Sequence, residues 1–153
     1  MSYTWVNWMV VSIAVLVTVF GPKRLPAHEN FFLWAITAAF AEAFDYLVAG
    51  TFNQYDYGPT PEIDISDVAQ VVLVNPCLGL MLLNFWPERK AFPLKLLYWG
   101  IWIGGLILME LLWLRVGLIR YNDWSIWKSM MCYPLLFVVL RLSQLAYRRS
   151  LPK

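Results

Sequence analysis

The sequence is poor in the residue types that carry most polar chemistry. Among its 153 residues, 14% are charged, two are cysteine and one, His28, is histidine. A single histidine excludes a multi-histidine metal site, and His28, in a loop beside Glu29, is expected to be solvated or to begin a helix rather than to serve in a Ser-His-Asp triad. A Gly-rich phosphate loop, an HExxH motif and a GxSxG motif are also missing. The sequence therefore predicts no catalytic residue, no metal site and no cofactor.

The low net charge and the small number of cysteines exclude other classes of function. The net charge is only +2, which is too small for a nucleic-acid partner whose binding depends on neutralising phosphates. Cys77 and Cys132 form no C-x-x-C pair and lie within apolar runs, where cysteine behaves as a small apolar side chain. Neither nucleic-acid binding nor dithiol redox chemistry is expected.

Apolar residues are abundant instead. They make up 60% of the chain, against roughly 45–50% in soluble domains. Five runs approach the length of about 20 residues that crosses a bilayer as a helix, and none alternates as a barrel strand does. They cover about 5–20, 31–49, 67–86, 94–118 and 124–146. The sequence predicts an all-α integral membrane bundle of five transmembrane helices, in one domain over 1–153.

Lysine and arginine collect on one side of these runs. Eight cations lie after the first, third and fifth runs, the loop 51–66 has none, and the link 119–123 has only Arg120. Cytoplasmic loops carry the excess of positive charge. We therefore expect an outer N-terminus and a cytoplasmic C-terminus in the bacterial cytoplasmic membrane, although Arg115 and Lys128 flank the last outer link and reduce the bias.

The polar residues inside the runs share one predicted depth, the outer half of the membrane. Glu42 and Asp45 are three residues apart and share a helix face. An ionisable group at the centre of a spanning helix costs roughly 2.5–3.5 kcal/mol, so each is a candidate for function. We expect acids and cations to face each other across a polar pocket. The expected pocket residues are Glu42, Asp45, Tyr46, Glu110, Arg115, Tyr121 and Lys128.

The inner halves of the runs hold few polar groups apart from Arg141, whose long side chain reaches the headgroups. This asymmetry predicts an outward-facing pocket that binds or passes a small polar ligand, an ion or a lipid headgroup. Two alternatives stay open. The charges can fix helix register in an accessory subunit with a membrane-protein partner or in a homo-oligomer, or the carboxylates can serve a lipid or isoprenoid enzyme.

Two patterns concern helix packing. Proline at Asn75-Pro76, in the middle of the third run, predicts a kink, and the carbonyls it frees can also line a site. Small residues recur at a spacing of four at Gly100 and Gly104 and at Ala35, Ala39 and Ala43. Such stripes allow close backbone approach, so we expect the second and fourth helices to pack together within the monomer.

One stretch carries a more specific pattern. Glu110 precedes Gly117-Leu118-Ile119-x-Tyr121-Asn122-x-Trp124 and Ser129, and Leu25-Pro26-x-His28 follows the first run. Over about 25–142, this pattern resembles a family of small uncharacterised multi-pass membrane proteins from endospore-forming Bacillota. Many members have Gly at Asp123 and Tyr at Asn75. The resemblance implies the same membrane topology and a family motif of Glu110, Tyr121 and Trp124, and it implies no activity.

Overall fold

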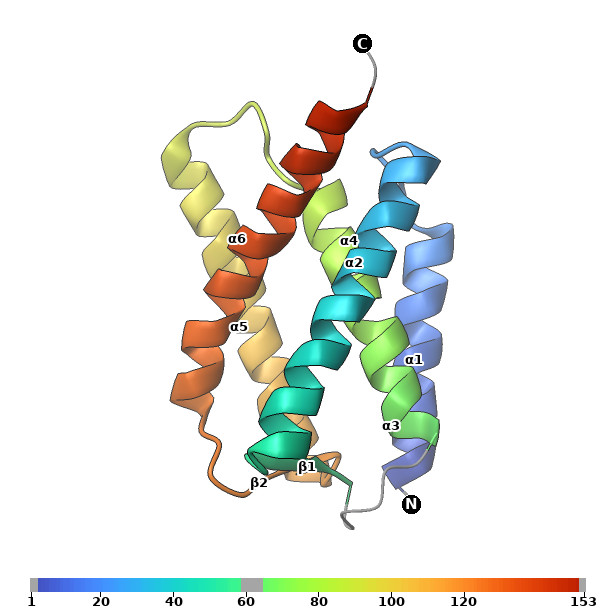
Figure 1. Cartoon of the computed structure of the whole chain (residues 1–153), viewed down its shortest axis with the longest axis vertical. Coiled ribbons are helices and arrows are strands. Elements are labelled where there is room, and N and C mark those ends of the chain that lie inside the picture. The colour runs from blue at the N-terminus through green and yellow to red at the C-terminus, as the bar shows by residue number, and fades with distance from the viewer. Residues whose placement is uncertain (1–2, 59–64, 152–153) are drawn as a thin grey trace.

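Five helical segments alternate in direction in the computed structural model, which describes residues 3–58 and 65–151 (Figure 1). They are α1 (Tyr3–Phe20), α2 with η1 (Ala27–Asp45, Tyr46–Thr51), α3 with η2 and α4 (Ile65–Ala69, Gln70–Val74, Asn75–Asn84), α5 (Phe92–Val116) and α6 (Ile126–Ser150). Pro59, Pro61 and Lys153 lie outside the described residues. The all-α bundle is confirmed, with bounds close to the five expected runs.

The helices suit a membrane by length and composition. Four of those described are long and apolar enough to cross one, and Thr4–Phe20 is apolar but shorter. Large apolar side chains such as Phe20, Phe31 and Leu108 are exposed on the outside of the bundle, where a soluble protein would place polar residues. The chain is a membrane protein.

Pro76 changes the geometry of the third segment. Its ring nitrogen has no N–H, and the ring crowds the carbonyl group four residues earlier. A wider π-helical turn, η2, lies immediately before α4 and accommodates this defect. The expected kink therefore takes the form of a π turn, and Asn75 is left at the first position of α4.

The apolar core lies where α2, α4 and α6 meet. Its buried centre consists of Leu33, Leu80, Leu83 and Leu140. Helices α2 and α4 approach closely at Gly79, since a methyl group on Gly79 would lie 3.0 Å from the side chain of Thr37. This contact, rather than the predicted small-residue stripes, brings two backbones together.

The expected packing of those stripes is wrong. A methyl group added at Gly100 or Gly104 would meet no atom within 4 Å, so this side of α5 faces outward. The alanines at 35, 39 and 43 of α2 are likewise exposed. Their regular spacing marks one helix face in each case, but spacing alone does not say whether that face meets protein or lipid.

Polar contacts hold α1 at both ends. Near its start, the fully buried Asn7 amide lies 3.2 and 3.3 Å from Ser66 Oγ and Asp67 Oδ1. After its end, the backbone N–H groups of Arg24 and Leu25 donate to Asn84 Oδ1 at 3.0 and 3.1 Å. Asn7 and Asp67 thus fasten α1 to α3, away from the expected pocket.

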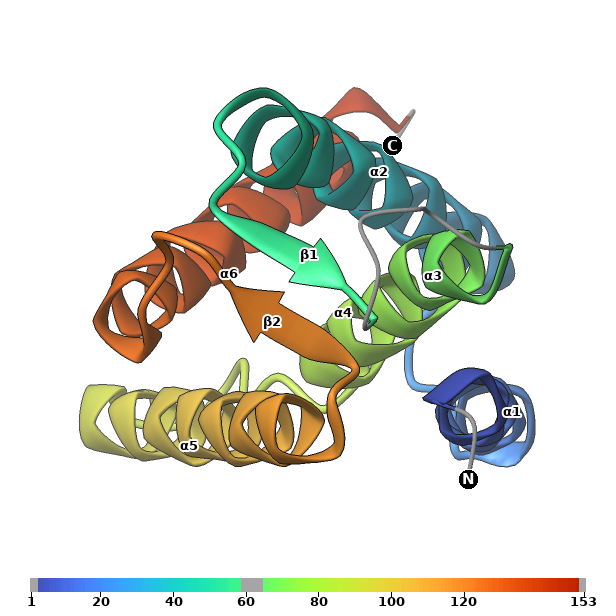
Figure 2. The same ribbon diagram turned by 90° about the horizontal axis from the view of Figure 1, so that it is seen from below.

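A small antiparallel sheet crosses the end of the bundle that also holds the N-terminus, here called the sheet end (Figure 2). Strand β1 (Tyr55–Tyr57) pairs with β2 (Ile119–Tyr121), so that Tyr55 faces Tyr121 and Tyr57 faces Ile119. Both segments were expected to be plain loops. Strands of three residues are too short for periodicity to reveal, although each alternates as a strand does.

The opposite end of the bundle is closed by charges. Glu29, which is 3% exposed, accepts hydrogen bonds from Gln144 Nε2 at 2.6 Å and Arg148 Nε at 2.8 Å. Arg148 and Arg141 also pair with Glu88. Burial opposes ionisation of Glu88, but hydrogen bonds from both arginines outweigh it and lower the pKa of this carboxyl group. We call these five residues the clasp.

The clasp corrects the expectation that this half of the bundle is almost bare of polar groups. Glu29 lies outside the predicted second run, and Gln144 carries no charge, so a search for ionisable residues inside the runs misses both. Arg141 binds Glu88 and Gln144 in the protein, rather than extending freely to the headgroups.

We predict that Arg148→Met destabilises the protein in mild detergent by about 2 kcal/mol, measured by thermal unfolding. Removing one partner of a fully buried pair costs roughly 3–5 kcal/mol. The loss here is smaller because the Arg148 side chain is 31% exposed and solvent screens the pair.

The adjacent exposed Arg149 provides the control, and Arg149→Met should unfold within about 0.5 kcal/mol of wild type. Adding Glu29→Gln to Arg148→Met should recover part of the loss, because the buried charge is then removed. Equal losses in the two arginine variants would contradict the role of the clasp.

Candidate functional site

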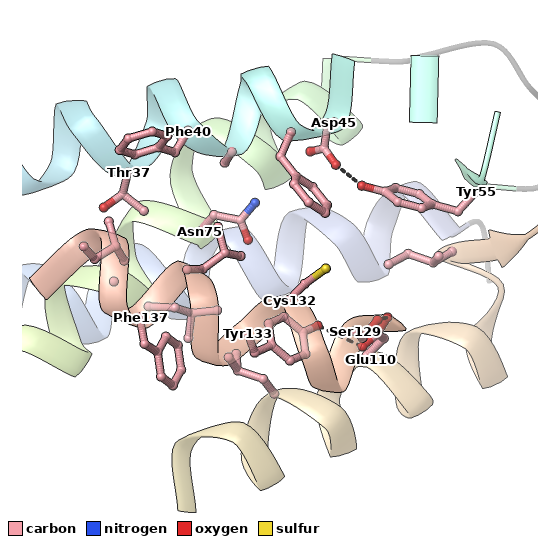
Figure 3. Close-up of a pocket in the computed structure, with 18 of the residues that line it drawn as sticks. Thr37, Phe40, Asp45, Tyr55, Asn75, Glu110, Ser129, Cys132, Tyr133 and Phe137 are labelled. Atoms are coloured by element: carbon pink, nitrogen blue, oxygen red, sulfur yellow. Dashed lines mark hydrogen bonds between the residues drawn. The ribbon is translucent and has the colours of Figure 1, made fainter. Parts of the chain in front are cut away.

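A cavity of about 180 Å³ lies among α2, α4, α5 and α6 and reaches the sheet (Figure 3). Ten of its lining residues are Phe, Tyr or Trp, and two, Asp45 and Glu110, are acidic. The sheet contributes Tyr55, Tyr57 and Tyr121 to the wall at its end of the bundle. Two carboxyl groups thus border one space that is rich in aromatic residues and lies within the bundle.

Glu110 is the centre of one hydrogen-bond group. It is 6% exposed and belongs to the last third of α5. Ser129 Oγ donates to its Oε1 at 2.5 Å, Tyr133 donates to its Oε2 at 2.8 Å, and the Tyr121 hydroxyl also donates to Oε1. Trp124 Nε1 donates to Ser129 Oγ at 2.8 Å and so orients that hydroxyl group.

Asp45 forms a second group on the other side of the cavity. It ends α2, and its two oxygens accept from the hydroxyl groups of Tyr55 and, at 3.1 Å, Tyr57. The two tyrosines lie two residues apart on β1, so they project from the same face of the strand. Burial, and then the nearby Asp45, raise the pKa of both tyrosines, so both remain protonated donors at neutral pH.

The other face of the sheet positions these tyrosines. Arg120 pairs with Asp56 at 2.8 Å, and Asn122 also donates to Asp56; hydrogen bonds from both lower the pKa of this carboxyl group. The carbonyl group of Gln54 accepts backbone N–H bonds from residues 122, 123 and 124 at 2.9–3.1 Å. Gly117, with φ of 77°, ends α5 in the left-handed conformation that glycine adopts freely.

Asn75 adds a polar group without a partner. Its side chain lines the cavity from the start of α4. Within residues 3–58 and 65–151, no hydrogen bond to this side-chain amide is found, although an amide offers two donors and an acceptor. A half-buried amide that faces a cavity unpaired is available to a bound molecule.

Four of the seven expected pocket residues do not line this cavity. Glu42 is exposed, Tyr46 is 74% exposed, and Arg115 is exposed in the last turn of α5. Helix α2 faces the cavity with Thr37, Ala41 and Asp45, and Glu42 is turned by roughly 100° from Ala41. Lys128 instead donates to Gln54 Oε1 and the Asp123 carbonyl group, each at 2.7 Å.

The expected neutralisation of these acids by cations is therefore wrong. Among the described residues, ion pairs join Arg120 to Asp56, Arg141 to Glu88, and Arg148 to Glu29 and Glu88. Hydroxyl groups satisfy the acids of the cavity instead. Tyr55, Tyr57 and Tyr133 were not expected at the site, because nothing in the sequence distinguishes a tyrosine that bonds an acid from one that only packs.

A signal for two of the donors was nevertheless present, because Tyr121 and Ser129 belong to the pattern that follows Glu110 in the sequence. Tyr133 lies four residues after Ser129 on the same face of α6, but this spacing alone does not indicate a bond to an acid. Within the described residues, no group of three or more His, Cys, Asp or Glu side chains is placed to hold a metal ion.

Comparison with known protein families, curated proteins and solved structures finds no match. Membership of the Bacillota membrane family therefore stays a prediction. The three residues of its expected motif, Glu110, Tyr121 and Trp124, do line the same cavity. In the structure they are an acid, a phenol that donates to it and an indole that donates to Ser129.

We predict that Tyr55→Phe destabilises the protein by roughly 1.5–3 kcal/mol in thermal unfolding, since Asp45 then loses a donor to a charged acceptor. Tyr46→Phe is the matched control, because Tyr46 is exposed and lies outside the cavity. It should leave the free energy of unfolding within about 0.5 kcal/mol of wild type. Equal effects of the two changes would contradict the role of Tyr55.

Proposed function

We propose that this membrane protein binds a small polar ligand in the cavity between Asp45 and Glu110, without catalysing a reaction. The observation that carries the proposal is that three polar side chains from α2, α4 and α5 border one cavity within the bundle. Two are the carboxyl groups, and the third is the unpaired Asn75 amide. Each burial costs free energy that an apolar side chain would not.

The alternative is that these groups only hold the helices together, as an accessory subunit would require. In that case they should be among the strongest contacts within the bundle. The Asn75 amide makes no such contact among the described residues. The hydroxyl groups that bond to Asp45 and Glu110 could also bond to the side-chain amide of an Asn or Gln in their place. This arrangement favours groups kept for a ligand over groups kept for stability.

Thermal unfolding in mild detergent distinguishes a ligand-binding role of these groups from a structural one. We expect Asp45→Asn, Glu110→Gln and Asn75→Leu to unfold at or above the temperature of wild type. The first two keep an acceptor oxygen in place and remove a buried charge, and the third replaces an unsatisfied amide by an apolar side chain. Glu42→Gln makes the same chemical change on the exposed face of α2 and controls for charge loss.

The opposite result would show that Asp45, Glu110 and Asn75 serve to hold the helices together. If the cavity variants unfold well below wild type, by the equivalent of roughly 3 kcal/mol, while Glu42→Gln does not, the cluster stabilises the bundle. The accessory-subunit interpretation would then replace ligand binding.

We further propose that the protein lies in the bacterial cytoplasmic membrane with the sheet end outside. The support is the distribution of cations: Lys23, Arg24, Arg89 and Lys90 occupy the links at the clasp end, and Arg148 and Arg149 end α6 there. Cations are retained on the cytoplasmic side.

Reporter fusions measure this orientation directly. Green fluorescent protein fused after the last residue should fluoresce, and alkaline phosphatase fused at the same point should be inactive, because the first folds in the cytoplasm and the second needs an oxidising outer compartment. The reverse pattern would show that the clasp end lies outside.

A further inference from the structure

We propose that the ligand of the cavity carries a small organic ammonium group, bound between the carboxylates and the aromatic walls. The inference rests on the proposed function and names the chemical class of its ligand. It is drawn from three features of the cavity, which are its charge, the character of its walls and its size.

The charge of the cavity is uncompensated. None of the described residues that line the cavity is Lys, Arg or His, whereas two of them, Asp45 and Glu110, are acidic. Every hydrogen bond found for these two carboxyl groups joins them to a hydroxyl group, and a hydroxyl group can donate to an ionised carboxylate. Hydroxyl donors carry no net charge, so the negative charge remains for a cation to balance.

Lys128, a cation beside one of the aromatic walls, is engaged elsewhere. Lys128 Nζ lies 5.5 Å from the centre of the Trp124 ring but bonds to Gln54 and to the Asp123 carbonyl group in the outer link. It does not line the cavity. A cation for the two carboxylates must therefore come from outside the described part of the chain.

The walls favour an organic cation over a metal ion. Aromatic rings attract cations through the negative charge of their faces, and they favour poorly hydrated ammonium groups. Trp102, Trp113, Trp124 and Phe44 surround the space that the acids border. A metal ion such as calcium needs six to eight oxygen ligands, and the described residues provide no group of three acids for one.

Size and hydrogen bonding agree with a small head group. The volume of about 180 Å³ is below the roughly 300–1,000 Å³ of pockets for drug-sized ligands. The Asn75 carbonyl oxygen is available to accept from an ammonium N–H, and the remaining acceptor positions of the two carboxylates can do the same. A primary to tertiary amine with few other atoms fits these limits, and a small quaternary ammonium, which has no N–H group, fits the volume and is held by charge and aromatic contact alone.

Cys132 provides a reporter inside the cavity, where its side chain lies near Tyr133 and Ser129 (Figure 3). In a Cys77→Ala background it is the only cysteine of the chain. The protein in mild detergent is treated with methanethiosulfonate reagents that carry an ammonium or a sulfonate group. Each labelling rate is divided by the rate for the unfolded protein, which removes the intrinsic difference between the reagents.

We expect the ammonium reagent to label Cys132 at least roughly tenfold faster than the sulfonate reagent, because a cleft lined by one sign of charge concentrates the opposite sign. Glu110→Gln should lower this ratio, and the matched Glu42→Gln should not. Tetramethylammonium chloride should slow labelling by a neutral reagent, whereas sodium chloride at the same ionic strength should not.

The outcomes separate this inference from the proposed function. If the two charged reagents react equally fast and tetramethylammonium gives no protection, the ammonium assignment is overturned. The unfolding temperatures of the cavity variants still decide whether a ligand site exists. If those variants are strongly destabilised as well, both proposals fail.

Discussion

Polar groups in the spanning helices must find hydrogen bonds within the protein, because hydrocarbon offers none. This constraint determines both ends of the bundle. At the sheet end, hydroxyl groups from β1, β2 and α6 converge on Glu110 and Asp45. At the clasp end, Gln144 and Arg148 reach Glu29. The apolar core between them, where α2, α4 and α6 meet, needs no such partners.

The two ends of the bundle satisfy their carboxyl groups with different kinds of partner. In the clasp, arginine satisfies and neutralises Glu29, and little charge is left over. In the cavity, tyrosine and serine satisfy the carboxylates but leave their charge in place. A phenol also has an apolar ring, so the same residues that bond the acids complete the aromatic wall. Four tyrosines serve both purposes, so the cavity wall has polar groups at a few positions and is otherwise mostly apolar. They are Tyr55, Tyr57, Tyr121 and Tyr133.

The sequence was sufficient to predict the helices, because apolar runs of membrane length seldom occur outside spanning helices. It also indicated Asp45 and Glu110, whose charge is conspicuous in such runs, and Tyr121 in the link after Glu110. Glu42 and Arg115 were equally conspicuous, but their faces of α2 and α5 turn away from the cavity. Which side of an apolar helix meets protein depends on its neighbours, and large apolar residues also lie on the exposed faces of α2 and α5. The short strands and the tyrosine donors were missed because their pairing joins distant parts of the chain.

The pairing of β1 with β2 has a consequence for biogenesis. Tyr55 meets Tyr121 across a long stretch of sequence, so β1 has no strand partner until α3, α4 and α5 have been synthesised. Glu29 similarly waits for Arg148, near the end of the chain. Since synthesis proceeds from the N-terminus, Glu29 is made long before Gln144 and Arg148, whereas Tyr55 and Tyr57 follow closely after Asp45. The buried acid in the clasp is therefore the last to obtain its partners.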